Sequence, residues 1–172
     1  TPDEAITAVT RVAAEYDAIN GKREAIPALH LIVAVAKKQP GEDGLYLERI
    51  AEPVLNQYTE AARARGVLLF LDIQVGWSDV LSEVKLLANT LQEPFVHLAL
   101  DPEFATRHTQ TAPGIVIGRL DSEQINDVQT YLSQLVRELQ LPPKVLVLHQ
   151  FLDHMLMDTE NYADVTEVDL TI

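Results

Sequence analysis

The chain has 172 residues with 26 acidic and 13 basic side chains, which give a formal net charge of −13. Nucleic acids and anionic membrane surfaces select clustered basic residues, whereas the lysines and arginines here are scattered, so we expect neither nucleic acid nor a membrane as a partner. The absence of cysteine excludes disulfides, thiolate metal sites and cysteine nucleophiles. We expect one domain over residues 1–172 that binds a neutral or cationic small molecule.

The first part of the chain alternates helical and extended patterns. Residues 1–4 are Thr-Pro-Asp-Glu, a typical helix start, and apolar residues at intervals of three and four extend this helix to Gly21. Residues 30–36 predict a buried strand. A helical pattern then covers residues 45–65, and Pro53 inside it predicts a kink or a restart.

The pattern of the chain is centred on residues 66–77, an apolar run bounded by glycines. It is too short for a helix of its own and predicts a strand that is buried on both faces, as in parallel sheets covered by helices. Because side chains alternate along a strand, Asp72 and Gln74 are expected on one face and Leu71 on the other. Trp77, the only tryptophan, directly follows this strand.

The rest of the chain repeats the alternation of helices and strands. The predicted elements are a helix at 78–91, a strand at 95–101, a helix at 121–139, a strand at 144–151, a short helical piece at 158–163 and a last strand at 165–172. The pattern lapses between residues 102 and 120, apart from a short apolar stretch at 115–118, and loops of this length tend to be functional.

Strands separated by helices predict an α/β fold with a parallel β/α repeat. A complete TIM barrel usually needs about 250 residues, so this chain supplies about five to six of its units. We therefore expect a TIM-barrel-like arrangement that is partial or truncated, a fragment of a larger barrel. The alternative is an open doubly wound parallel sheet. Polar residues at the ends of successive strands favour the barrel-like interpretation.

Carboxylates at these strand ends are the candidate catalytic residues, namely Asp72, Asp101 and Glu103. Two carboxylates at one cleft can divide acid and base roles, as glycoside hydrolysis requires. We therefore predict a hydrolase, most plausibly acting on a carbohydrate ligand, with Asp101 or Glu103 as proton donor. Asp101 precedes Pro102, however, and could simply initiate a turn.

Further polar or aromatic residues near the strand ends are candidates for substrate binding. These are Gln74, Trp77, His149, Gln150 and Asp169. Packing is the more common role for a tryptophan between a strand and a helix. His97, in the middle of an apolar strand, is most simply a hydrogen-bonded core histidine.

Two other functions stay open from the sequence. Asp72, Asp101 and His149 could meet as ligands of a divalent metal in a metal-dependent hydrolase, although no sequence motif for a metal or cofactor occurs and we expect none. The domain could instead be non-catalytic, binding a ligand or a partner, or associating with itself, through its last strand as a free sheet edge.

Overall fold

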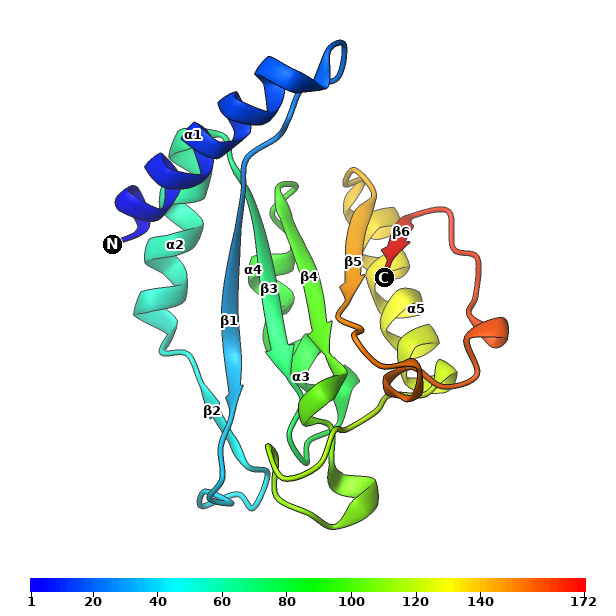
Figure 1. The fold of residues 1–172 in the computed structure, drawn as a ribbon. Coiled ribbons are helices and arrows are strands. Elements are labelled where there is room, and N and C mark those ends of the chain that lie inside the picture. The colour runs from blue at the N-terminus through cyan, green and yellow to red at the C-terminus, as the bar shows by residue number, and fades with distance from the viewer.

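The computed structural model describes all residues from Thr1 to Ile172, and its centre is one six-stranded sheet (Figure 1). The strands are β1 (Ala28–Ala36), β2 (Leu47–Arg49), β3 (Leu68–Gln74), β4 (Val96–Asp101), β5 (Lys144–Leu148) and β6 (Val168–Thr171). Their order in the sheet is β2-β1-β3-β4-β5-β6. The short edge strand β2 is antiparallel to β1, and all other neighbours are parallel.

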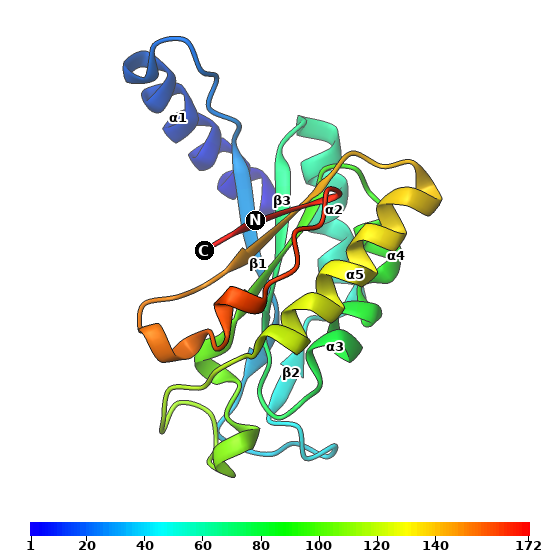
Figure 2. The same ribbon diagram turned by 90° about the vertical axis from the view of Figure 1, so that its right-hand side faces the viewer.

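Four of the five helices cover one face of the sheet (Figure 2). The helices are α1 (Pro2–Asn20), α2 (Glu52–Arg65), α3 (Val80–Leu86), α4 (Ala88–Leu91) and α5 (Ser122–Leu139). Helices α2 to α5 form the covering layer, whereas α1 packs against α2 and β1. The connections contain four 3₁₀ turns, at Pro102–Phe104, Arg107–Thr109, Asp153–Met155 and Thr159–Asn161.

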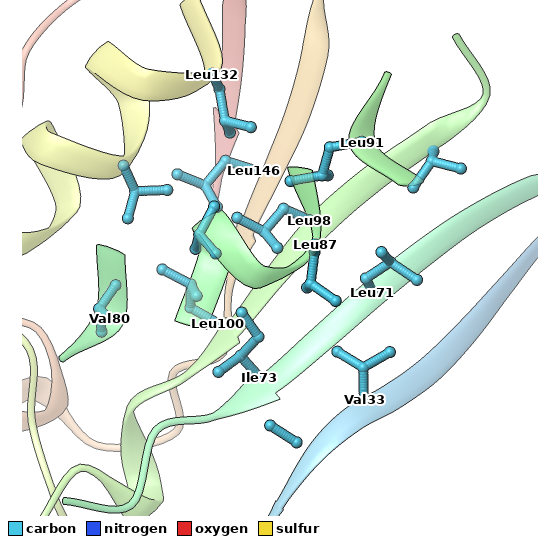
Figure 3. Close-up of a cluster of buried hydrophobic side chains, with 14 of the residues drawn as sticks. Val33, Leu71, Ile73, Val80, Leu87, Leu91, Leu98, Leu100, Leu132 and Leu146 are labelled. Atoms are coloured by element: carbon cyan, nitrogen blue, oxygen red, sulfur yellow. The ribbon is translucent and has the colours of Figure 1, made fainter. Parts of the chain in front are cut away.

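The hydrophobic core lies between the sheet and this helical layer (Figure 3). Alternate residues of each strand point toward the helices, and on β3 these are Leu69, Leu71 and Ile73, which have no exposed surface. Leu132 of α5 and Leu146 of β5 complete the same layer. Each such buried side chain contributes about 1.5–3 kcal/mol, so this one-sided core is the main source of stability.

The opposite face of the sheet has no helix over it (Figure 2), and we call it the open face. Ile32 points to this face and is 41% exposed, whereas the next residue, Val33, is 3% exposed. The register of β1 shifts between Ile32 and Ala34, which is a bulge that turns both Val33 and Ala34 toward the core. Ile32 therefore remains partly accessible on the open face, whereas its two successors belong to the core.

The buried face includes one charged residue, Lys144, at the start of β5. Its side chain points toward the helices and has no exposed surface. The ammonium Nζ donates to the carbonyl oxygens of Glu93, at 2.6 Å, and Val96, at 2.9 Å. Burial lowers the pKa of Lys144 to about 8. These two bonds connect the loop before β4 to the start of β5, so Lys144 has a structural role.

The architecture is thus an open α/β fold with a mostly parallel sheet that does not close into a barrel. From β1 onward the strand order runs in one direction without a reversal, so the sheet lacks the switch point of a doubly wound fold. The helices of the parallel crossovers accordingly lie on one face.

Three predicted elements differ from the observed ones. The helix expected at 45–65 begins only at Glu52, because Pro53 fits the first turn of a helix and not its interior, and residues before it form β2. The helix expected at 78–91 is interrupted at Leu87, which separates α3 from α4. The piece at 158–163 contains only a 3₁₀ turn.

Candidate functional site on the open face

The candidate site is built around Asp72, which is the third residue from the carboxyl end of β3. Asp72 pairs in register with Ile32 on β1 and Ala99 on β4, and its side chain points to the open face. Although no helix covers that face, the Asp72 side chain is only 6% exposed, because neighbouring side chains surround it. A buried carboxylate on an otherwise open surface needs partners, and two histidines supply contacts.

His30 and His149 approach the same oxygen of Asp72 from opposite sides. His30 Nε2 lies 2.9 Å from Asp72 Oδ2, and His149 Nε2 lies 3.7 Å from it. The two imidazole rings are 5.1 Å apart between centroids. We call these three residues the His–Asp–His cluster. His30 comes from β1, Asp72 from β3, and His149 directly follows β5.

The small side chain of Ala99 makes this convergence possible. Strand β4 lies between β3 and β5, so His149 has to reach across β4 to approach Asp72. Ala99 pairs with Asp72 on one side and with Val147 on the other, at the crossing point. It is fully buried although it points to the open face. A larger side chain at this position would occupy the path of His149.

The cluster contains polar atoms that are buried without a hydrogen-bond partner. These atoms are Asp72 Oδ1 and His149 Nε2. The distance of 3.7 Å between His149 Nε2 and Asp72 Oδ2 exceeds the normal range of a hydrogen bond. His30 does form a hydrogen bond with Asp72, which raises the pKa of His30. The cluster therefore has unused capacity to bind a ligand.

Asp101, at the end of β4, is a further carboxylate on this face. It pairs in register with Gln74, two residues beyond Asp72 on β3. Burial raises the pKa of Asp101 to about 6, and the negative charge of Asp72 adds to this effect. Asp101 Oδ1 accepts a hydrogen bond from the backbone N–H of Glu103. Asp101 thus both begins the following turn, as expected from Pro102, and titrates close to neutrality.

The other predicted site residues occupy separate positions. Gln74 Oε1 accepts from the N–H of Ala36 at 2.9 Å, and thereby ties β3 to the end of β1. The Trp77 ring contacts Tyr46, with centroids 4.7 Å apart, and its Nε1 donates to the carbonyl oxygen of Thr111. These contacts join loops at the carboxyl end of the sheet.

Three further predicted residues form no hydrogen bond or ion pair with the cluster. Glu103 is half-buried in the turn after β4. Gln150 is exposed and donates to the carbonyl oxygen of Asp153. Asp169 is exposed on β6, in register with Val145 and so near the start of β5.

His30 was not among the residues that the sequence singled out. It lies near the start of β1, far from the polar strand ends, but pairs in register with Phe70, two residues before Asp72 on the same face of the sheet. Knowledge of the β1–β3 register would have identified it. The prediction for His97 is confirmed, because His97 is 6% exposed and its Nδ1 accepts from the N–H of Val145.

The two largest of the described cavities lie elsewhere in the molecule. One, of about 360 Å³, is at the carboxyl ends of β3 and β4, where Arg107 and Arg119 are among the lining residues. The other, of about 370 Å³, is between α2 and α3 on the helical face. Neither is lined by His30, Asp72 or His149, so the cluster is an open surface site and not part of these cavities.

The fold and the site together define an open-faced α/β protein with a His–Asp–His cluster on its uncovered sheet face. No protein-family model, no curated protein and no solved structure matches the chain. None of its helices has the length and apolar character required to span a membrane.

Proposed function

We propose that the protein is a hydrolase whose reaction takes place on the open face, at the His–Asp–His cluster and Asp101. The observation that carries this proposal is the convergence of His30 and His149 on the buried carboxylate of Asp72. Asp101 lies on the adjoining strand, where its pKa is raised to about 6. Ionisable groups with perturbed pKa values that gather on one surface are typical of catalytic sites.

The two parts of this site correspond to the two requirements of hydrolysis. A scissile bond or an attacking water has to be polarised, and we assign this role to the cluster. A proton has to be transferred to or from the reacting atoms, and we assign this role to Asp101, because a group that titrates close to neutrality can both accept and release a proton. The backbone N–H of Glu103 holds one oxygen of Asp101 and leaves the other free.

The finer architecture that we propose is barrel-like. Strands β1, β3, β4, β5 and β6 follow one another in space without reversal, and the helices cover only the outer face, as in a β/α barrel. In such an arrangement the open face corresponds to the barrel interior. Polar side chains at the carboxyl ends of the strands would then face a common centre.

Glycoside hydrolysis stays a prediction. Its pair of carboxylates would be Asp72 together with either Asp101 or Glu103. It requires that two carboxylates share a sugar-binding cleft. Asp72 is engaged with His30, which favours a histidine-assisted reaction over a purely carboxylate-based one.

The test is a screen of chromogenic esters, phosphoesters and glycosides, followed by substitution of the proton-transfer residue. We expect Asp101→Asn to lower kcat by about 10²–10⁴-fold, because it removes proton transfer while keeping the size of the side chain. Asp164→Asn is the matched control, since Asp164 is exposed and outside the site. Turnover that is unchanged in Asp101→Asn would remove Asp101 from the reaction, and no turnover on any of these bond types would contradict the hydrolase.

A further inference from the structure

We propose that His30, Asp72 and His149 bind one divalent transition-metal ion, with zinc as the best-matching chemistry. The binding of this ion follows from the geometry of the cluster alone. Its use as the polarising centre of the reaction rests on the proposed function.

The donor set is one that zinc and similar ions prefer. Two imidazoles and one carboxylate are the ligands of many catalytic zinc sites, which keep a further position open for water or substrate. Magnesium and calcium prefer sites made of oxygen atoms only. Because the chain has no cysteine, histidine nitrogens are its softest strong donors. The cluster is therefore selective for an ion that accepts imidazole.

The spacing of the donors is close to that of a metal site. Two ligands that each lie about 2.1 Å from a tetrahedral ion are about 3.4 Å from each other. The two distances to Asp72 Oδ2, 2.9 Å from His30 Nε2 and 3.7 Å from His149 Nε2, bracket this value. All three donor groups lie within 4.8 Å of one another.

The unsatisfied atoms favour an ion over a simple hydrogen-bonded pair. A His30–Asp72 pair alone accounts for Asp72 Oδ2, but it leaves Asp72 Oδ1 and His149 Nε2 buried without partners. Buried polar groups in folded proteins are nearly always satisfied, so such atoms call for an explanation. A bound cation coordinates His149 Nε2 directly and compensates the buried charge of Asp72, and it thus accounts for both atoms.

The surroundings of the cluster leave space for an open coordination position. The side chains of His30 and His149 are 42% and 40% exposed, so solvent reaches the cluster from the open face. The carboxylate ligand is buried and fixed, whereas the two imidazoles form the accessible rim. Asp101 lies on the adjoining strand and is outside the ligand set.

The experiment is a titration of the purified, chelator-treated protein with Zn²⁺ by isothermal calorimetry, and with Co²⁺ by visible absorption. We expect one ion per chain, no binding of Mg²⁺, and a Co²⁺ spectrum with the visible bands of nitrogen and oxygen coordination. His30→Ala and His149→Ala should each raise the Kd for Zn²⁺ by at least about a hundredfold, which is the upper end of the effect for residues that only support ligands. Both histidines are partly exposed, so these variants are expected to fold.

His154→Ala is the control, because His154 is exposed and lies outside the cluster. Zinc binding that is equally strong in the wild type, His30→Ala and His149→Ala would overturn the proposal, as would the absence of one-to-one binding in the wild type. Asp101→Asn separates this inference from the proposed function. It should retain zinc affinity within a few-fold while it loses turnover. In the wild type, zinc binding without hydrolysis of any tested substrate would contradict the hydrolase alone, and hydrolysis that survives removal of the metal would contradict the metal's role.

Discussion

His97 and Asp101 point to the same face of β4, and burial shifts their pKa values in opposite directions. Burial disfavours the charged form of any group, so it lowers the pKa of His97 to about 4 and raises that of Asp101 to about 6. His97 is thus held neutral, which suits an acceptor of the Val145 N–H. Asp101 is held where it can change its protonation state near neutrality. On this strand, His97 therefore has a structural role and Asp101 has a proposed chemical role.

We expect Asp101→Asn to stabilise the protein at neutral pH while it abolishes activity. The folded-state pKa of Asp101 is raised from 3.8 to about 6, so the folded chain binds more protons than the unfolded chain between these values. The free energy of unfolding therefore falls as the pH rises through this window. Removing the carboxylate should add about 1–2 kcal/mol above about pH 7, after allowance for solvent screening, and nothing below about pH 4.

Urea unfolding of the wild type and Asp101→Asn at several pH values is the measurement. Other titrating groups, such as His97, contribute to both proteins and cancel in the difference. A variant that is less stable than the wild type at neutral pH would show that Asp101 is stabilised in its charged form.

At the level of single strands, part of the fold and of the site follows from the sequence. The apolar runs predicted the four buried parallel strands β1, β3, β4 and β5, and alternation separated Asp72 from Leu71 on opposite faces of β3. What sequence could not provide is the pairing of strands distant in the chain. The β1–β3 register places His30 beside Asp72. The small side chain of Ala99 lets His149, which follows β5, reach across β4 to Asp72 on β3.

We expect Ala99→Leu to weaken zinc binding by at least about tenfold, an effect comparable to loss of a ligand-supporting residue. The leucine side chain would occupy the space through which His149 reaches Asp72. Ala99→Gly is the control, because it keeps that space free. The measurement is zinc affinity by competition with a chelating dye, with circular dichroism to verify the fold. Equal affinity in Ala99→Leu and the wild type would mean that His149 is not a ligand.

At the scale of the whole molecule, one face of the sheet carries the stability and the other carries the proposed chemistry. The core joins β1, β3, β4 and β5 to a single helical layer, and the His–Asp–His cluster lies on the side that this layer leaves free. Substitutions on the open face can therefore change the site at small cost to folding. The sequence did not reveal that only one face of the sheet is covered by helices. A strand whose second face carries His, Phe and Ala still appears in the sequence as a continuous apolar run.

Adjacent residues on β1 allow a direct test of this division. We expect Val33→Ala to lower the free energy of unfolding by about 1–2.5 kcal/mol, because Val33 is 3% exposed and faces the helices. Ile32→Ala removes a larger group but should cost less than about 1 kcal/mol, since Ile32 is 41% exposed. Chemical denaturation at low protein concentration is the measurement. A larger loss for Ile32→Ala than for Val33→Ala would mean that the open face is covered in solution.

The two borders of the sheet are unequal, and this restricts how copies of the chain could join. The β2 border is three residues long and includes the charged Glu48 and Arg49, features that oppose strand pairing. The β6 border has a free side along Val168–Thr171. A symmetric dimer formed there must pair its two β6 strands antiparallel, about a twofold axis perpendicular to the sheet. Such an axis keeps both clusters on the same surface, so the dimer would present two reaction centres side by side to one extended substrate.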